Sequence, residues 1–240
     1  MRKLIIGVIG NPQIDSEGYP LTALYNEYKN VLIDNNAIPF IICPLSNIDY
    51  FNTDTGLEPE ITDKEKEMYK EMVDMCDGLL IQGAYKLYNF DEYIVRYALS
   101  KDMPILGICA GMQLLASIDN NEDSLVFIDT KNHNDIYNDY VHDVSIKDNS
   151  LLHSIINTNR LKVNSRHKYK IDKVNKFVVS ATSDDNIIEA IELPNKLFVL
   201  GLQWHPEKLY YKDESSKLII KYFIQKVGEY ANNINKKFTN

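Results

Sequence analysis

The sequence predicts an α/β fold in which a mostly parallel sheet is covered by helices on both faces. Two observations predict it. In the first half of the chain, short and uninterrupted apolar runs alternate with longer segments of helical periodicity. Strands buried on both faces have this apolar character, because helices cover both sides of a parallel sheet. In the second half, apolar runs follow one another across short polar turns, which indicates antiparallel additions to the sheet.

The first half contains four expected strands: Lys3–Gly10, Ala37–Cys43, Gly78–Ile81 and Pro104–Ile108. Helices are expected between and after them, over Leu21–Asn35, Thr62–Met75, Asp91–Ser100 and from Ala110 onward. Apolar residues, Tyr28 among them, recur at helical spacing in the first helix, and Thr62 or Asp63 is the expected N-cap of the second. Because reactive groups gather at the carboxyl ends of parallel strands, Gly83 and Cys109 both stand at candidate site positions.

Strands also dominate the second half, at Leu125–Ile128, Val141–Ile146, Leu161–Asn164, Phe177–Thr182, Ile187–Leu193 and Leu197–Trp204. The polar segment Asp119–Asn138 is expected to be mostly a surface loop. A closing helix is expected over Ser215–Tyr230, with a frayed polar tail from Asn232. No repeat or linker divides the chain, so residues 1–240 are expected to form a single domain.

Composition and charge argue against several functional classes. A formal net charge of −8, with no dense basic run, argues against a nucleic-acid partner. The N-terminal apolar run is too short for a signal peptide, and no run approaches the roughly 20 residues that span a bilayer. We therefore expect a cytoplasmic protein with no membrane partner. The three cysteines form no C-x-x-C pair, which argues against disulfides and structural zinc, and Cys43 and Cys76 are expected to be buried, inert thiols.

The segment Pro104–Gln113 has the features of a nucleophile elbow. Gly107 and Gly111 flank Cys109 in a G-x-C-x-G spacing, the cysteine counterpart of G-x-S-x-G, in which small residues permit a sharp strand-to-helix turn. Good helix formers follow from Met112, so Cys109 is expected at a helix N-terminus. There the unpaired N–H groups and the positive end of the helix dipole favour thiolate over thiol.

The segment Gln203–Glu207 contains the partners that a thiolate nucleophile requires. His205 follows an apolar strand that Pro206 ends, so the imidazole is expected at the same sheet edge as Cys109. Glu207 is the expected orienting carboxylate, which keeps one ring nitrogen protonated so that the other accepts a proton. Taken alone, the segment is also compatible with a loop histidine beside a solvated glutamate.

Two backbone N–H groups are candidates for an oxyanion hole. Ala110 directly follows the nucleophile, and Gly83 follows a buried strand at a point where glycine permits close approach of the backbone to a substrate. Losing one such donor typically costs about 10²–10³ in rate. The loop after the third strand is therefore expected to matter for catalysis.

The four remaining histidines have weaker sequence signals. His133, His142 and His153 lie in polar or strand-edge contexts, which indicate surface or hydrogen-bonded roles. His167 follows a strand in a basic turn with Arg166. For His167, a role at the site and a solvated turn are both open.

These motifs, in this order, resemble the class I glutamine amidotransferase superfamily. Within it the chain is similar to the γ-glutamyl hydrolase-type peptidases (peptidase C26-like), which include γ-glutamyl-γ-aminobutyrate hydrolases. The matching segments are Asp77–Gly83, Pro104–Gln113, Val163–His167, Ile188–Glu192 and Gly201–Glu207. The resemblance implies a flavodoxin-like three-layer sandwich.

The resemblance also implies a Cys109–His205–Glu207 triad. Such a triad attacks a side-chain γ-amide, forms a γ-glutamyl thioester on the cysteine and hydrolyses it with water. The implied partner is a small γ-glutamyl substrate, and no cofactor or metal is needed. The residues that the matching motifs suggest for substrate binding are Gln113, Asn164, Ser165 and His167.

The chain departs from the family pattern along the expected substrate rim. Gln82-Gly83-Ala84-Tyr85 stands where paired glycines and an aspartate are usual, and Ala110 stands where a larger or basic residue is common. Lys168-Tyr169 replaces the second His and the Gln of the N-S-x-H-H-Q pattern. We therefore expect preserved catalysis with a shifted substrate. A glutaminase subunit that supplies a separate synthase, and a non-catalytic binding protein, both remain open, as does a homodimer.

Overall fold

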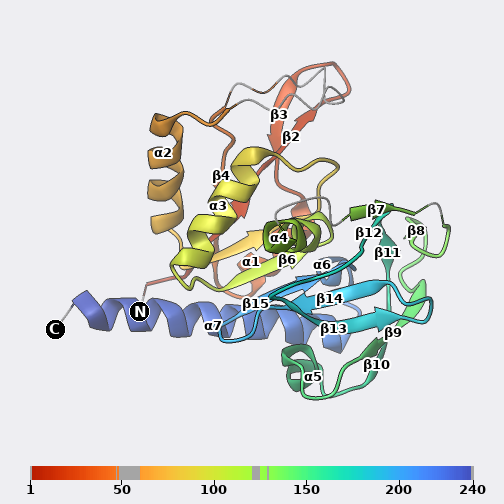
Figure 1. Cartoon of the computed structure of the whole chain (residues 1–240). Helices are drawn as coiled ribbons and strands as arrows, with labels where there is room; N and C mark the ends of the chain where they lie inside the picture. The colour runs from red at the N-terminus through yellow and green to blue at the C-terminus, as the bar shows by residue number, and fades with distance from the viewer. Residues whose placement is uncertain (1, 47, 49–59, 121–124, 129, 239–240) are drawn as a thin grey trace.

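The computed structural model describes residues 2–46, 48, 60–120, 125–128 and 130–238. Its largest sheet has the strand order β10-β9-β13-β14-β15-β6-β5-β1-β4 (Figure 1). In chain order these strands are β1 (Ile5–Ile9), β4 (Ile38–Ile42), β5 (Gly78–Ile81), β6 (Ile105–Ile108), β9 (His142–Ile146), β10 (Arg160–Val163), β13 (Val178–Ser183), β14 (Ile188–Glu192) and β15 (Val199–Leu202). From β4 to β15 all pairings are parallel, and from β15 to β10 all are antiparallel. The predicted α/β class with antiparallel additions is confirmed.

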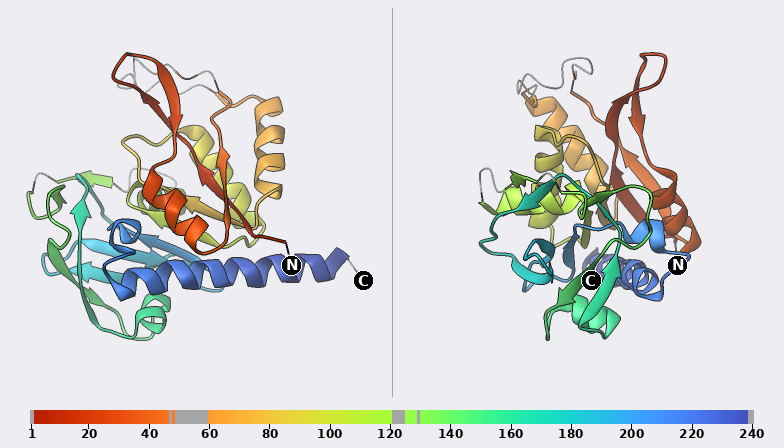
Figure 2. Two further views of the ribbon diagram at one scale, coloured as in Figure 1. Left: turned by 180° about the vertical axis from the view of Figure 1, so that it is seen from behind. Right: turned by 90° about the vertical axis from the view of Figure 1, so that its right-hand side faces the viewer.

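Helices cover both faces of this sheet. They are α1 (Asn26–Asp34), α2 (Asp63–Asp74), α3 (Asn89–Ser100), α4 (Ala110–Asn120), α5 (Leu151–Ile156), α6 (Pro206–Leu209) and α7 (Glu214–Phe238). On one face α2, α3 and α4 bury residues such as Tyr69 and Ile94. On the other face α1, α5 and α7 bury residues such as Val31 and Phe223, and α7 runs along the underside of the sheet (Figures 1 and 2). The result is the predicted three-layer arrangement.

The start of the first predicted helix belongs to a β-hairpin instead. Strands β2 (Asn11–Ile14) and β3 (Pro20–Ala23) stand out from the body of the molecule in both views of Figure 2, and the helix begins only at Asn26. The buried side chain of Gln82 explains where the hairpin ends. Its amide donates to the carbonyls of Ile9 and Ala23 and accepts from the N–H of Tyr25. These tertiary bonds override the helical spacing of the apolar residues.

The capping of α2 follows the prediction. The Thr62 side chain accepts a bond from the Glu65 N–H at 3.3 Å, and the Glu65 carboxylate accepts one from the Thr62 N–H at 2.7 Å. This reciprocal pair is a capping box, which satisfies two N–H groups that the helix itself leaves unbonded. Thr62, rather than Asp63, is the N-cap.

The structure adds to the expectations in three further places. In the described part of Asp119–Asn138, strand β7 (Leu125–Phe127) was expected, whereas the two-residue strand β8 (Asn134–Asp135) was not. These strands pair with β12 (Tyr169–Ile171) and β11 (Ser165–Arg166), and residues 121–124 and 129 lie outside the described part. The short helix α5 was not predicted. The closing helix continues to Phe238, because Ala231 is buried and Ile234 packs against the core.

The two cysteines outside the elbow differ from each other. Cys76 is buried as expected, and burial raises the pKa of its thiol to about 12, so it is inert at neutral pH. Cys43 is exposed, contrary to expectation, because the chain leaves the sheet directly after β4. Among the described helices, none combines the length and apolar composition that a bilayer crossing requires.

Sheet order explains where a site forms. β5, β6 and β15 are parallel neighbours, with Ile81 beside Gly107 and Leu202 beside Ile108. Their carboxyl ends therefore lie at one edge of the sheet. The loop containing Gly83, the elbow at Cys109 and the segment at His205 follow these three strands and meet there.

Candidate active site

Cys109 adopts a backbone conformation that side-chain-bearing residues rarely adopt. Its φ is 54°, at the corner between β6 and α4. The other non-glycine residues with positive φ in the described part of the chain are Asn or Asp, which tolerate the left-handed region. A cysteine there carries local strain that the surrounding structure must hold in place, and such strain is concentrated at functional sites. The predicted elbow therefore has the expected geometry.

The glycines beside the elbow are required by close packing. A Cβ on Gly111 would lie 2.4 Å from the carbonyl oxygen of Ile81, and one on Gly107 would lie 2.7 Å from the carbonyl oxygen of Gly111. Both neighbours are backbone atoms, which cannot turn aside as a side chain can. The G-x-C-x-G spacing thus lets α4 pack directly against the end of β5.

We expect Gly111→Ala to lower the free energy of unfolding by about 1–3 kcal/mol or more, because the added methyl group forces α4 away from β5. Urea denaturation measures this. The matched control is Gly228→Ala in α7, where the nearest atom to an added Cβ is Leu4 Cδ1 at 3.8 Å. Alanine is the better helix former, so the control is expected to gain about 0.5–1 kcal/mol. Equal midpoints for the two variants would contradict the packing argument.

His205 and Glu207 form a short, buried pair. Nδ1 of His205 lies 2.7 Å from Oε1 of Glu207, and both residues are buried. Pro206 begins helix α6 directly after His205, which is the N-cap, and the first turn brings Glu207 back toward the ring. A carboxylate can only accept here, so Nδ1 carries a proton and Nε2 is the nitrogen available to Cys109.

The electrostatics of this pair favour a protonated imidazole. Burial opposes the charge, but the Glu207 carboxylate and the neighbouring Cys109 outweigh it and raise the pKa of His205 to about 10. The imidazolium is therefore the resting form at neutral pH. It holds a proton that a leaving amine can take.

Asn164 fixes the backbone of His205. Its side-chain oxygen accepts from the His205 N–H at 2.8 Å, and its amide donates to the His205 carbonyl at 2.8 Å. Asn164 is almost fully buried, so both bonds are shielded from water. Its side chain is thus committed to positioning the histidine. This differs from the expected role in substrate binding.

Tyr28 also contacts the site, which sequence reasoning missed. Its hydroxyl accepts from the Gly83 N–H at 2.9 Å and lies 3.4 Å from Nδ1 of His205. Burial, and then the charge of Glu207, raise the pKa of Tyr28 well above its usual range, so the phenol stays neutral. The Gly83 N–H reaches an oxyanion only by leaving this hydroxyl. Its oxyanion role, like that of Ala110, stays a prediction.

A cavity of about 370 Å³ opens beside Cys109 and His205. Its wall includes three cationic side chains, Arg166, Lys168 and Lys208, of which Lys208 pairs with Glu27 at 3.0 Å. The Nε of Arg166 is buried and donates to no acceptor among the described residues. A negatively charged group on a ligand is the partner that such a donor favours.

The remaining predicted rim residues are divided between cavity and interior. Gln113 and His167 line an adjoining cavity of about 380 Å³ that also reaches Cys109. Ser165 is fully buried and donates to the His133 carbonyl at 3.1 Å, so it lies behind the rim. Arg166, one residue further, projects into the cavity instead. The alternation of side chains along β11 accounts for the difference.

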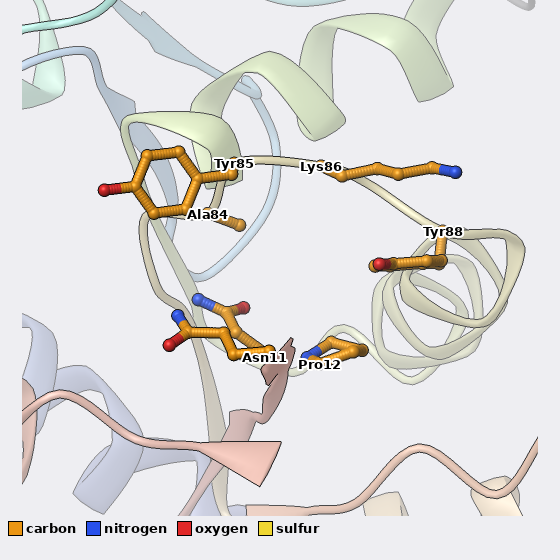
Figure 3. Close-up of a pocket in the computed structure, with 7 residues that line it drawn as sticks. Asn11, Pro12, Ala84, Tyr85, Lys86 and Tyr88 are labelled. Atoms are coloured by element: carbon orange, nitrogen blue, oxygen red, sulfur yellow. The ribbon is translucent and has the colours of Figure 1, made fainter. Parts of the chain in front are cut away.

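Another cavity, of about 430 Å³, lies beside the loop that follows β5 and shares Ala84 and Tyr85 with the cavity at Cys109. Figure 3 shows Asn11 facing Tyr85 and Lys86 across it. Tyr85 is 98% exposed and borders both spaces. Sequence reasoning identified the altered residues of this loop but gave no signal for the β2 side of the cavity, because the hairpin was not predicted.

Comparison with known proteins identifies relatives. The family model of peptidase C26 matches residues 88–207. A CTP synthase of Levilactobacillus brevis is 27% identical over 197 residues, which cover 66% of this chain but 36% of that protein. A glutamine amidotransferase-like protein of Rickettsia prowazekii is 26% identical over 257 residues, covering 80% of this chain and 84% of its own. The chain thus spans about a third of the CTP synthase.

Solved structures share the fold over nearly the whole chain. A GMP synthase-type protein of Thermoplasma acidophilum aligns over 98% of this chain and 99% of its own, with a TM-score of 0.66 and 18% identity. The glutaminase domain of the Trypanosoma brucei CTP synthase aligns over 95% and 94%, with a TM-score of 0.63 and 16% identity. At these identities the likeness is one of fold, and it confirms the flavodoxin-like sandwich.

Proposed function

Because the chain belongs to the peptidase C26 family, with cysteine-dependent, glutamine amidotransferase-like chemistry, we propose that it is a hydrolase of γ-glutamyl amides. The observation that carries the proposal is the arrangement of Cys109, His205 and Glu207 beside a cavity with cationic walls. Nucleophile, proton carrier and orienting carboxylate are the three groups that acyl transfer through a thioester requires.

In the proposed reaction the Cys109 thiolate attacks the γ-carbonyl carbon of the substrate. The resulting oxyanion is stabilised by the N–H groups of Ala110 and Gly83, once Gly83 has exchanged its bond to Tyr28. The C–N bond then breaks as His205 gives its proton to the leaving amine, which leaves a γ-glutamyl thioester on sulfur. Water attacks the thioester and gives one proton to His205, and the C–S bond breaks to restore the thiolate and release the γ-carboxylic acid, which loses its remaining proton to solvent.

Arg166 is the residue that we propose for substrate recognition. A γ-glutamyl group has an α-carboxylate, and a planar guanidinium binds carboxylates through charge-assisted hydrogen bonds. The guanidinium of Arg166 and the nearby ammonium of Lys168 offer donors on the same wall of the cavity. The leaving amine would then extend toward Tyr85 and the cavity of about 430 Å³ beside the loop after β5, where the chain departs from the family pattern.

We expect Arg166→Gln to raise KM for a γ-glutamyl amide by about 10–100-fold, the range for losing one hydrogen bond to a charged group. The change in kcat is expected to be small, because Arg166 binds the part of the substrate that does not react. Lys162→Gln, which removes a positive charge from exposed β10, is the matched control and is expected to leave KM unchanged. Steady-state kinetics of the two variants measures this, and a KM that rises equally in both would count against Arg166 as the carboxylate site.

The function itself is tested with a panel of γ-glutamyl amines and γ-glutamyl peptides, glutamine, and α-glutamyl amides. Amine release is measured with the Cys109→Ala protein as the blank, and quenched samples are weighed by intact-protein mass spectrometry. We expect release from at least one γ-glutamyl amide, a γ-glutamyl adduct on Cys109, and no release from α-glutamyl amides. If no compound of the panel shows Cys109-dependent amine release, the proposed function is wrong.

A second candidate is a glutaminase that supplies ammonia to a separate synthase. The similarity to CTP synthases favours it, because this chain matches only a part of their length. It predicts that glutamine is the preferred member of the panel and that a synthase co-purifies with the chain and stimulates the reaction. A preference for a bulkier γ-glutamyl amide, with no synthase recovered, would favour the hydrolase.

A further inference from the structure

Three histidines and one glutamate converge behind the active-site rim, and we propose that they form a metal site for one divalent transition-metal ion, with zinc as the best fit. The ligand atoms are Nδ1 of His133, Nε2 of His142, Nε2 of His167 and Oε1 of Glu189, and all lie within 4.8 Å of one another. They come from four separate segments of the chain. His133 precedes β8, His142 begins β9, His167 follows β11, and Glu189 lies in β14.

Four of the six separations among these atoms are those expected around a tetrahedral ion, and the other two are within 4.8 Å. Nδ1 of His133 lies 3.2 Å from Nε2 of His167 and 3.3 Å from Oε1 of Glu189. The same carboxylate oxygen lies 3.6 Å from Nε2 of His142 and 3.6 Å from Nε2 of His167. Nitrogen and oxygen ligands at zinc bond lengths in a tetrahedron are separated by about 3.3–3.5 Å. The four observed separations range from 3.2 to 3.6 Å and therefore bracket the tetrahedral value.

The outward-facing ring nitrogens support the same conclusion. Nδ1 of His167 lies 2.9 Å from the Tyr169 carbonyl, Nδ1 of His142 lies 3.2 Å from the Asp143 carbonyl, and Nε2 of His133 lies 3.0 Å from the Asp185 carboxylate. Because these oxygens can only accept, each of these nitrogens carries the ring proton. The lone pair of every ring is then directed into the cluster. Histidines that ligate metals are oriented by second hydrogen bonds of this kind.

Burial favours a positive charge at this position. The side chains of His133, His167 and Glu189 are each 1% exposed. Neither oxygen of Glu189, nor Nε2 of His142, has a hydrogen-bond partner among the described residues. A buried carboxylate faced by three lone pairs is strongly unfavourable unless a positive charge lies among them. A proton on Nδ1 of His133 is the alternative occupant, but it serves only part of the cluster.

Four protein ligands with no open position are typical of a structural metal site rather than a catalytic one. The ion would join β8, β9, β11 and β14. Asn134 and Arg166, the neighbours of His133 and His167 in these segments, line the cavity at Cys109. The Tyr169 carbonyl that orients His167 also accepts from Gln113 at 3.1 Å. The metal would therefore hold the substrate rim in place.

No metal was expected from the sequence, because the cysteines form no C-x-x-C pair and the family resemblance implies chemistry that needs none. The ligands here are spread from residue 133 to residue 189 and come together only when the antiparallel strands pair. His133 lies in a segment that was expected to be a surface loop. No short spacing motif marks such a site.

The test uses Cys109→Ala protein, so that the active-site thiol cannot bind the probe metal. The protein is stripped with a chelator and titrated first with Co²⁺ and then with Zn²⁺. We expect one equivalent of Co²⁺ to produce the intense visible bands of four-coordinate cobalt, and one equivalent of Zn²⁺ to bleach them. We also expect the thermal midpoint to rise with Zn²⁺, because the ion binds the folded state.

Variants assign the ligands. Glu189→Gln and His142→Asn, in the same background, are expected to lose the cobalt bands. His153→Asn is the matched control, because this histidine lies in α5 near Asp148, outside the cluster, and is expected to keep them. If the Cys109→Ala protein shows no stoichiometric cobalt bands, the proposal is wrong and the cluster holds a proton instead of a metal ion. This outcome does not depend on whether the ligand variants fold. Bands that persist unchanged in Glu189→Gln and His142→Asn, or bands with sulfur charge-transfer character, also overturn it.

Discussion

Replacing Cys109 by alanine is expected to reduce amine release by about 10⁴-fold or more, because both halves of the proposed reaction pass through a bond to its sulfur. The fold is expected to persist. Alanine is smaller than cysteine, and the residue at this corner already has a φ of 54°, which alanine tolerates no worse. Substrate binding should persist as well, since the cavity wall that includes Arg166 is unchanged.

The measurement is amine release under saturating substrate, together with the urea midpoint. Cys43→Ala is the matched control, because it removes an exposed thiol and is expected to keep full activity. Cys76→Ala tests the buried thiol in the same way: it leaves a small cavity, so stability falls while activity stays. Activity retained by Cys109→Ala at more than a tenth of the wild-type level would remove the thioester from the mechanism.

Glu207→Gln is expected to lower kcat/KM by about 10³–10⁴-fold, the range for removing the carboxylate that orients a catalytic histidine. The amide keeps the shape of the side chain but loses the charge 2.7 Å from Nδ1 of His205. Burial then dominates, and the pKa of His205 falls from about 10 toward or below the ordinary value near 6.5. The variant would lack the imidazolium at neutral pH.

The sign of the pH effect follows from the direction of this shift. In the wild type the folded pKa of His205 is raised, so its contribution to stability is fully present below about pH 6.5 and is lost as the pH rises toward 10. Activity that depends on the imidazolium is lost over the same upper range. In Glu207→Gln this stabilising contribution disappears, because the folded and unfolded pKa values of His205 become similar, and the alkaline loss of activity moves to lower pH.

The pH profile of kcat/KM, with the urea midpoint measured at each pH, checks this prediction. Glu229→Gln, on α7, serves as the control because it removes a surface carboxylate paired with Lys226 and leaves His205 unaffected. An alkaline limb near pH 10 in both wild type and Glu207→Gln would show that Glu207 does not set the charge of the histidine.

The parts of the fold that could be predicted from sequence are those governed by local pattern. The strands that end at Ile81 and Ile108 are short apolar runs with clear limits, and the capping residues of α2 are local signals. The β2–β3 hairpin could not be predicted, because it is held by the buried Gln82, which is distant in sequence. The extension of α7 depends in the same way on the packing of Ile234.

The site residues also differ in whether a local sequence pattern could predict them. The elbow at Cys109 and the spacing of His205 and Glu207 are contiguous motifs, so their proximity followed from the order of parallel strands. Tyr28 was interpreted as part of the apolar face of a helix, which it is, but its hydroxyl reaches Gly83 from there. Asn164 was interpreted from a motif as a binding residue, and its actual bonds to His205 could be found only in three dimensions.

The position of β15 has a consequence for the order in which the molecule is made. This strand is formed by residues near the end of the chain, yet it lies in the middle of the sheet between β6 and β14. During synthesis the thiol of Cys109 therefore emerges long before the strand that brings its imidazole. Pairing between such distant segments is slow, because a long loop must close first. Bringing the thiol and the imidazole together is therefore one of the slow, long-range pairings of this fold.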